Sequence, residues 1–311
     1  MGNFNGTSLM VFILVGFPAQ ARMPLSVLFL WMYTLTVSAN LLIIGTVKVE
    51  PRLQTPMYFF LSNFCFMEIW LISVTVPKML HNFLVEDETI SFIGCICQLY
   101  FFFSLGVTEC FLLVVMAYDR YLAICNPLRY PAIMTGKASW QLAITSWIGG
   151  FLSVFPLPFN TTNLSFCGPN TINHFFCDLS PVLKLSCTDP YLVEIMFFNF
   201  AWVIILCSFV QITVSYVFII ITILRIPSAL GRQKAFNTCG SHLTVVSIFY
   251  ASIMFMYVRP KASESTEFNK VVSLFYCAVI PLLNPIIYNL RNKEVKKAIR
   301  KILNRAGPVA Q

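Results

Sequence analysis

The sequence has few charged residues for its length. Only 11% of its 311 residues are Asp, Glu, Lys or Arg, whereas 58% are hydrophobic. Ordinary soluble domains contain about 25% charged residues. A chain with so little polar material cannot cover a folded surface that faces water. The composition therefore excludes a water-soluble domain, and we expect lipid to be the solvent of this chain.

Residues that support catalysis or metal binding are also scarce. There are only three histidines, His81, His174 and His242, and they lie too far apart in the expected topology to bind one metal ion. No glycine-rich phosphate-binding loop is present. We therefore expect neither an enzyme nor a metal site.

No cleavable signal peptide is recognisable, because the apolar stretch Leu9–Phe17 lacks a basic start and is followed by Pro18.

Long apolar segments dominate the rest of the chain. A membrane-spanning helix needs roughly 20 mostly apolar residues. Seven segments meet this requirement: residues 25–48, 57–80, 94–118, 138–158, 195–224, 236–258 and 271–290. The loops between them are short, so we expect one domain over residues 1–311. It is an all-α bundle of seven transmembrane helices, with tails at residues 1–24 and 291–311.

Basic residues indicate the orientation of this bundle. If the amino terminus is outside the cell, the inner loops and tail hold 15 of the 21 Lys and Arg residues, and the outer segments hold the other 6. Such a bias places the amino terminus outside and the carboxyl terminus in the cytoplasm. The net charge of +8 is explained by this topology, so a nucleic-acid partner is not expected.

The outer segments contain candidate glycosylation sites and disulfides. Asn5 lies in a sequon of the amino-terminal tail and is the expected glycosylation site, while use of Asn160 and Asn163 stays open. Thiols outside the cell are expected to be oxidised. The third predicted helix and the second outer loop supply an even set of four, for which three pairings are possible. The four cysteines are Cys95, Cys167, Cys177 and Cys187.

Four strings of residues carry a family resemblance. MAYDRYLAIC (Met116–Cys125) begins at the end of the third predicted helix, and the second helix begins within LQTPMYFFLS (Leu53–Ser62). The sixth begins with KAFNTCGSHL (Lys234–Leu243), and the seventh ends within PLLNPIIYNLRNKEV (Pro281–Val295). Together they resemble the hallmarks of vertebrate olfactory receptors of the tetrapod type, a branch of the rhodopsin-like G-protein-coupled receptors. Within the third string, Asn237 stands where Ser is usual in the family.

The resemblance implies a function and a disulfide pattern. The expected protein is an odorant receptor of the plasma membrane, in olfactory cilia, that activates a stimulatory heterotrimeric G protein and raises cAMP. The resemblance favours the pairs Cys95–Cys177 and Cys167–Cys187, with Cys95–Cys187 as the alternative. A rhodopsin-like receptor for a lipid or metabolite is the alternative function. A transporter or channel is disfavoured, because the number of spans is odd and no internal repeat is detectable.

A binding cavity for a small apolar volatile molecule is expected within the bundle. The absence of lysine from residues 271–290 excludes a retinal Schiff base, and Phe102 stands where amine receptors carry an aspartate. Helical spacing selects the residues of the third helix, and analogy with the receptor fold selects those of the fifth, sixth and seventh. The expected lining is Phe102, Phe103, Gly106, Val107, Cys110, Phe197, Phe200, Ala201, Ile204, Tyr250, Ile253, Tyr257, Leu274 and Cys277.

Polar residues inside the bundle indicate a switch and an ion site. Intramembrane acids are functional candidates, and we expect Glu68 and Glu109 to face each other near Asn40 and Asn284 and to hold a sodium ion or share a proton. No other cofactor is expected. The resemblance assigns G-protein coupling and switching to Asp119, Arg120, Tyr121, Tyr216, His242, Asn284 and Tyr288.

The cytoplasmic tail is predicted to begin with an amphipathic helix. Apolar residues recur at helical spacing, and lysines and arginines fill the remaining positions, so we expect the helix to lie on the inner leaflet. The apolar positions are Val295, Ala298, Ile299, Ile302 and Leu303.

Overall fold

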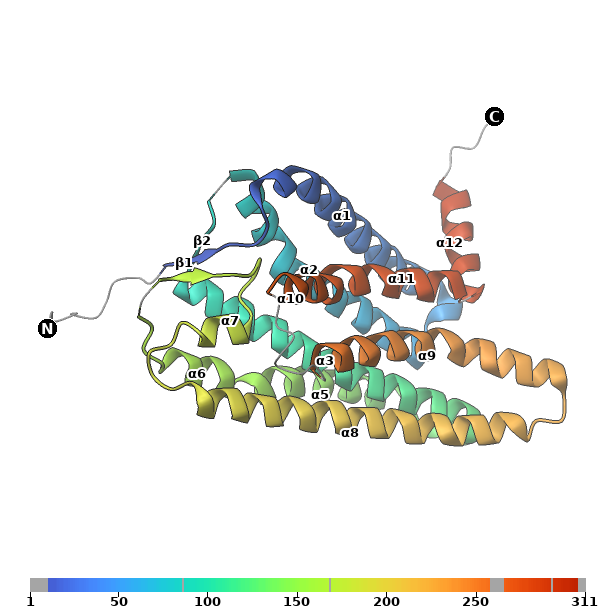
Figure 1. Cartoon of the computed structure of the whole chain (residues 1–311). Coiled ribbons are helices and arrows are strands. Elements are labelled where there is room, and N and C mark those ends of the chain that lie inside the picture. The colour runs from blue at the N-terminus through green and yellow to red at the C-terminus, as the bar shows by residue number, and fades with distance from the viewer. Residues whose placement is uncertain (1–10, 86, 168, 258–265, 292, 307–311) are drawn as a thin grey trace, which may run out of the picture.

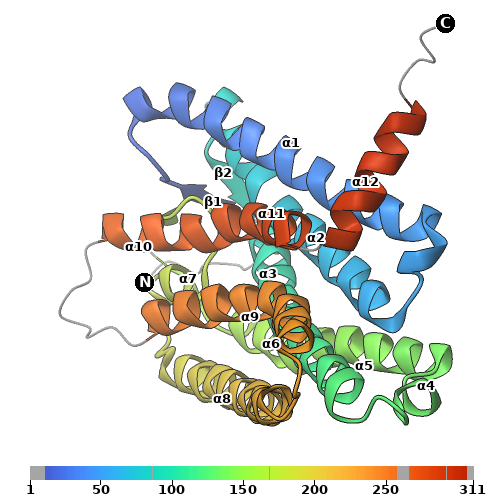
Figure 2. The same ribbon diagram turned by 90° about the vertical axis from the view of Figure 1, so that its right-hand side faces the viewer.

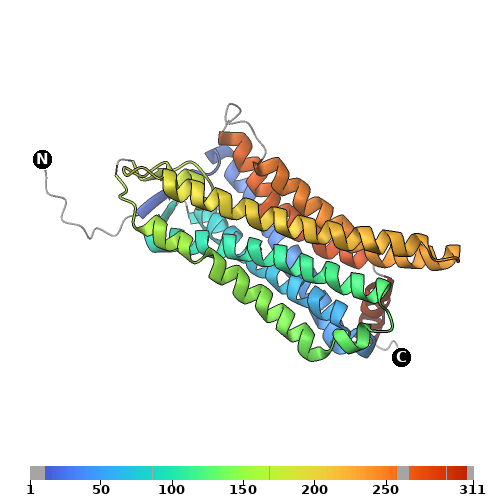
Figure 3. The same cartoon turned by 90° about the horizontal axis from the view of Figure 1, so that it is seen from below.

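The computed structural model describes residues 11–85, 87–167, 169–257, 266–291 and 293–306. Long helices run side by side in an elongated bundle (Figures 1 and 3). The first four transmembrane helices are α1 (Ala19–Val49), α2 (Pro56–Val85), α3 (Phe92–Cys125) and α5 (Gly136–Val154), which α6 (Pro156–Thr162) continues. The last three are α8 (Tyr191–Leu224), α9 (Ala229–Tyr257) and a helix made of α10 (Thr266–Leu274), η3 (Phe275–Val279) and α11 (Ile280–Arg291).

The seven-helix prediction is confirmed. Within the described residues, six helices are long and apolar enough to cross a membrane, and α9 contains a shorter apolar stretch, Cys239–Met254. Large hydrophobic side chains such as Trp31, Leu152 and Val210 are exposed on the outside of the bundle. In water such a surface would be unfavourable, whereas in lipid it is the expected outer face of a spanning helix.

Most helices extend beyond their expected ends. The helix α1 begins six residues before residue 25, with Pro24 inside it, and α2 continues past Pro77 to Val85. Similarly, α3 continues to Cys125, seven residues beyond residue 118. The expected ends were set by hydrophobicity, which marks only the part of a helix within the hydrocarbon layer. Helical structure continues outside it because backbone hydrogen bonds still favour the helix.

The helix α3 lies at the centre of the bundle. It packs against α2, α5 and α8, and the view along the bundle in Figure 2 shows it surrounded by the other helices. A small residue allows α5 to come close: a Cβ atom on Gly150 would lie 2.0 Å from Thr108 Oγ1. The central position of α3 leaves most of its side chains in the bundle interior.

A small sheet at the outer end was not expected from the sequence. Strand β1 (Val11–Leu14) lies between β2 (Thr89–Ser91), to which it is antiparallel, and β3 (Thr171–Ile172), to which it is parallel. The sheet joins the amino-terminal segment to both of the first two outer loops. An ion pair between Arg22 and Glu88 adds to this connection.

The end of the bundle opposite the sheet carries the short helices α4 (Tyr130–Ile133) and α12 (Lys293–Ala306) (Figure 1). Figure 1 shows α12 turned away from the bundle axis. As predicted for an amphipathic helix, Val295, Ala298 and Ile299 are buried; the side chains of Ile302 and Leu303 lie outside the described part. Lys301 Nζ lies 2.8 Å from Glu50 Oε2, which ties α12 to the residue that ends α1.

Candidate ligand-binding cavity and intracellular switch

A cavity of about 500 Å³ lies in the outer half of the bundle. Its walls come from α3, α8, α9 and the last helix, and its roof comes from residues 171–185 of the second outer loop. Ten of the expected lining residues do line it: Phe102, Phe103, Gly106, Val107, Cys110, Phe197, Phe200, Ala201, Ile204 and Ile253. Cavities of 300–1,000 Å³ with mostly apolar walls are typical of small-molecule sites.

Aromatic rings build the apolar walls. The ring centroid of Phe103 lies 4.6 Å from that of Phe197, in an edge-to-face arrangement that joins α3 to α8. The ring centroid of Phe102 lies 5.0 Å from that of Phe176 in the roof and 5.8 Å from that of Tyr276. These contacts fix the rings relative to one another. The cavity therefore has a defined shape before any ligand binds.

Three expected lining residues do not line the cavity. Tyr250 instead donates a hydrogen bond to Ser208 Oγ at 2.7 Å, which turns its side chain toward α8. The last helix contributes Val272, Ser273 and Tyr276 to the cavity lining, and not Leu274 or Cys277. Cys277 lies within η3, which is π-helical, and its wider turn departs from regular helical spacing. The side chain of Tyr257 lies outside the described part of the structure.

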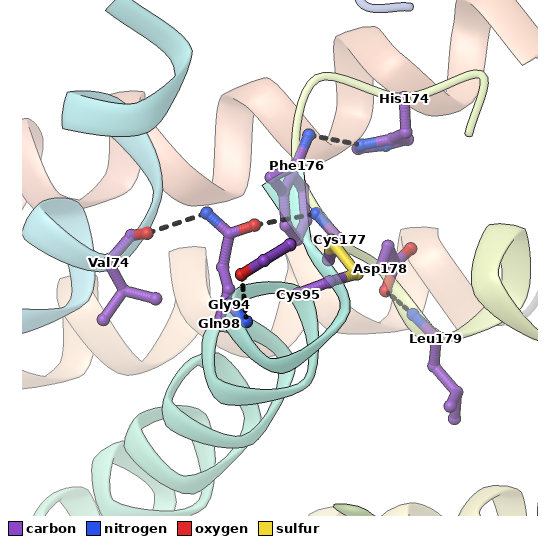
Figure 4. The surroundings of a disulfide bond; sticks show 10 residues. Val74, Gly94, Cys95, Gln98, His174, Phe176, Cys177, Asp178 and Leu179 are labelled. Carbon is purple, nitrogen blue, oxygen red and sulfur yellow. Dashed lines mark hydrogen bonds between the residues drawn. A yellow bond between two sulfur atoms is a disulfide. The ribbon is translucent and has the colours of Figure 1, made fainter. Parts of the chain in front are cut away.

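The roof is attached to α3 by a disulfide and by an amide. Cys95 bonds to Cys177, with 5.4 Å between their Cα atoms, and Cys167 bonds to Cys187. These are the pairs that the resemblance favours. One turn beyond Cys95, Gln98 accepts a hydrogen bond from the backbone N–H of Cys177 and donates one to the carbonyl of Val74, both at 2.9 Å (Figure 4). The loop is thereby held at a fixed height above the cavity.

Two ionisable groups of the roof are strongly affected by burial. Burial and, to a smaller degree, the positive charge of Lys270 lower the pKa of His174 to about 4. Burial raises the pKa of Asp178, although this carboxylate accepts a hydrogen bond from the backbone N–H of Leu179 at 2.8 Å. His174 is thus neutral at physiological pH, and its neutral ring lines the cavity.

Beneath the cavity lie the two intramembrane acids. Tyr276, which lines the cavity, donates a hydrogen bond of 3.5 Å to Glu109 Oε2. Deeper in the bundle, Asn284 Nδ2 donates to Glu68 Oε1. Both acids are buried, and Glu68 Oε2, Glu109 Oε1 and Asn40 Oδ1 have no hydrogen-bond partner among the described residues. These acceptors form a polar layer between the cavity and the cluster around Arg120.

Most of the expected switch residues gather around Arg120, at the end of the bundle that carries α4 and α12. Tyr216 and His242 form a hydrogen bond of 2.7 Å between α8 and α9, and their rings are stacked. Arg120 interacts electrostatically with both of them and with the buried Tyr288. Four helices therefore converge on one arginine.

The neighbouring acid has a second partner. Asp119 Oδ1 accepts a hydrogen bond of 2.8 Å from the hydroxyl of Tyr130 in α4, in addition to the electrostatic attraction of Arg120. Tyr121 packs its ring against Phe218 of α8. Asn284, by contrast, lies with the intramembrane acids, so it is not part of the cluster around Arg120.

Comparison with known proteins decides the family. The family model for olfactory receptors matches residues 29–306. The chain belongs to the olfactory receptor family. It is 52% identical over 301 residues to Olfactory receptor 6B9 of Mus musculus, covering 96% of this chain and 95% of that one. It is 49% identical over 303 residues to Olfactory receptor 6P1 of Homo sapiens, covering 97% of this chain and 96% of that one.

The family fixes the class of activity. This olfactory receptor is a multi-pass membrane protein of the G-protein-coupled class that detects odorants, and its family is one of receptors, not of enzymes. It is also similar to Olfactory receptor 226 of Rattus norvegicus, at 51% identity over 301 residues, covering 95% and 92% of the two chains.

Sequence reasoning missed the roof of the receptor's cavity. Asn173, His174 and Phe176 line it, yet they belong to a loop whose path cannot be read from hydrophobic periodicity. One signal was available: Cys177 directly follows Phe176, and a disulfide to the outer end of α3 brings both residues over the cavity. Gln98 was also missed, because a lone amide near a helix end has no recognisable pattern.

Proposed function

We propose that this olfactory receptor binds a small, mostly apolar volatile molecule in the cavity and activates the stimulatory G protein of olfactory neurons, which raises cAMP. The single observation that carries the proposal is the cavity itself, whose volume of about 500 Å³ and aromatic walls suit such a molecule. The α3 wall is apolar, and most of the polar lining residues, such as Asp178 and Lys184, belong to the roof. Affinity is therefore expected to depend mainly on burial of apolar surface and to be modest.

The proposal includes an orientation and a location. The basic helix α12 and the switch residues would face the cytoplasm, whereas the sheet, both disulfides and the roof of the cavity would face outward. Disulfides form and persist outside the cell, which supports this orientation. The expected location is the plasma membrane of olfactory cilia. Asn5, the expected glycosylation site, lies outside the described residues.

The activation step follows from the distance between the cavity and Arg120. Cys110 lines the cavity and lies ten residues from Arg120 on α3, which corresponds to about 15 Å. An odorant can act over this distance only by binding one arrangement of the helices more tightly than another. In the active arrangement, the inner end of α9 would move outward and release Arg120. Tyr216 and Tyr288 would then approach Arg120, and a G-protein helix would enter the opened cleft.

A sodium ion or a shared proton would stabilise one of these arrangements. Glu68 and Glu109 are buried, and each has a carboxylate oxygen without a partner among the described residues. Carboxylate and amide oxygens suit a hard cation, which would offset the cost of burying two acids. The hydrogen bond from Tyr276 to Glu109 would make this layer sensitive to a ligand in the cavity.

A panel of volatile compounds tests the proposal. Cells that express the receptor are compared with and without the olfactory stimulatory G protein, and cAMP is measured. We expect at least one weakly polar volatile compound to raise cAMP only when both proteins are present. Activation by lipids or metabolites alone, at normal surface expression, would favour the alternative function. A current that persists without any G protein would favour a channel.

A further inference from the structure

One side chain of the roof combines burial with an unused hydrogen-bonding atom. His174 lies between β3 and Cys177, is only 2% exposed, and lines the cavity. Its ring is stacked on Phe175, with centroids 4.7 Å apart, and meets Phe176 edge to face at 4.6 Å. Two aromatic neighbours therefore fix the plane of the imidazole ring.

The hydrogen bond at one ring nitrogen determines the role of the other. His174 Nδ1 accepts a hydrogen bond of 3.4 Å from the backbone N–H of Phe176 (Figure 4). In a neutral imidazole, one nitrogen accepts and the other carries the proton. Because Nδ1 accepts, Nε2 carries the proton and is a donor. Burial lowers the pKa of His174 to about 4, so the ring keeps this neutral form at physiological pH.

The Nε2 donor has no partner in the described part of the chain. A buried donor that lacks an acceptor is unfavourable, whereas a ligand that supplies an acceptor gains from the interaction. The ring is neutral, so it offers a hydrogen bond without a full positive charge. A neutral oxygen acceptor is therefore a better match than a carboxylate, which would have to be desolvated.

We propose that His174 is the polar anchor of the odorant site and donates its Nε2 hydrogen to a carbonyl, ester or ether oxygen of the ligand. The apolar remainder of the ligand would extend toward Phe103 and Phe197. The proposal rests on the proposed odorant-binding function and narrows its ligands to neutral, oxygen-containing volatiles. It also assigns the roof a direct role in choosing the ligand.

Two substitutions distinguish hydrogen-bond donation by His174 Nε2 from the role of this residue in the structure of the loop. In His174→Asn, the side-chain oxygen takes the place of Nδ1 and can still accept from Phe176, but no donor reaches the position of Nε2. In His174→Gln, the longer amide places a donor near that position. Surface expression is measured for both variants, and cAMP responses are recorded for aldehydes, ketones and esters together with alkenes of the same carbon skeleton.

For the oxygen-containing agonists, we expect His174→Asn to raise the half-maximal concentration about tenfold, the factor that about 1.4 kcal/mol represents. Alkenes that activate the receptor should change less than about twofold on the same scale, and His174→Gln should recover most of the lost sensitivity. An equal loss for both ligand classes, or no loss for the oxygen-containing class, would overturn the proposal.

A test on the ligand side does not depend on folding of the variants. In the wild-type receptor, replacing the carbonyl of an agonist by a methylene group should lower its potency about tenfold. Equal potency, or a response to alkenes without any response to carbonyl compounds, would overturn the anchor while leaving the odorant-binding function intact. A wild-type receptor that reaches the surface and responds to no volatile compound would overturn both.

Discussion

The aromatic wall of the cavity gives a prediction whose magnitude follows from the structure. Phe103 is half-buried and lines the cavity, where it meets the rings of Phe102 and Phe197. The change Phe103→Ala removes six ring carbons, or space for roughly one benzene molecule, on the order of 100–150 Å³. That is about a quarter of the cavity volume of about 500 Å³. The set of effective odorants should therefore change.

The potency of some odorants should fall and that of others should rise. An odorant that contacts the Phe103 ring should lose about 1–2 kcal/mol of apolar contact, or roughly 5- to 30-fold in potency. Odorants larger by one ring or a short chain should gain. The cost to folding is smaller than for a core residue, because the two ring pairs contribute only about 0.5–1.5 kcal/mol each. Surface expression should stay near the wild-type level.

A matched core variant provides the control. Phe60 is fully buried and is not a lining residue of the cavity. Its replacement by Ala should cost roughly 3–5 kcal/mol of stability and lower expression and every response alike. The assay is a dose–response series of cAMP for many odorants, normalised to surface expression. If Phe103→Ala lowered all responses by one common factor, as Phe60→Ala should, the ring would be a packing residue and the reasoning would be refuted.

Three further predictions concern the roof, the buried acids and the switch. Cys95→Ser should abolish surface expression or response, since loss of a disulfide costs roughly 2–5 kcal/mol and frees the roof from α3. Cys167→Ser leaves the attachment of the roof to α3 intact and should have a milder effect. Peptide mapping that finds Cys95 as a free thiol would contradict this prediction. Replacing Glu68 or Glu109 by Gln should change the sodium or pH dependence of signalling, and unaltered dependence in both variants would exclude an ion or proton site. Asp119→Asn should raise basal cAMP if the acid holds the inactive state, and an unchanged basal level would exclude that role.

Hydrophobicity and the strings that resemble the family predicted the helices and most of the cavity walls. In lipid, a single segment can satisfy its backbone hydrogen bonds only by forming a helix. Seven apolar segments therefore indicate seven helices. Positions such as Phe103 and Gly106 followed from helical spacing on α3, because that helix is regular where it meets the cavity. The prediction thus succeeded where one periodic element determines the geometry.

It was wrong where the geometry depends on an irregular element or a distant contact. Leu274 and Cys277 were chosen by analogy with the receptor fold, and Cys277 lies in the π-helical turn η3, which has no clear sequence pattern. Tyr250 was misplaced because its hydroxyl bonds to Ser208 on a different helix. The strand β1 was missed because four residues gain stability only by pairing with loops about 80 and 160 residues away. Such contacts are set by the folded structure as a whole.

The most direct test of the central claim compares Arg120→Ala with the wild-type receptor at equal surface expression. We propose that an odorant bound in the cavity acts on a G protein through Arg120. Odorant binding to membranes and odorant-stimulated cAMP are measured on the same cells. The account predicts that binding stays within about twofold of wild type and that cAMP production is lost. Wild-type cAMP production by Arg120→Ala would contradict it.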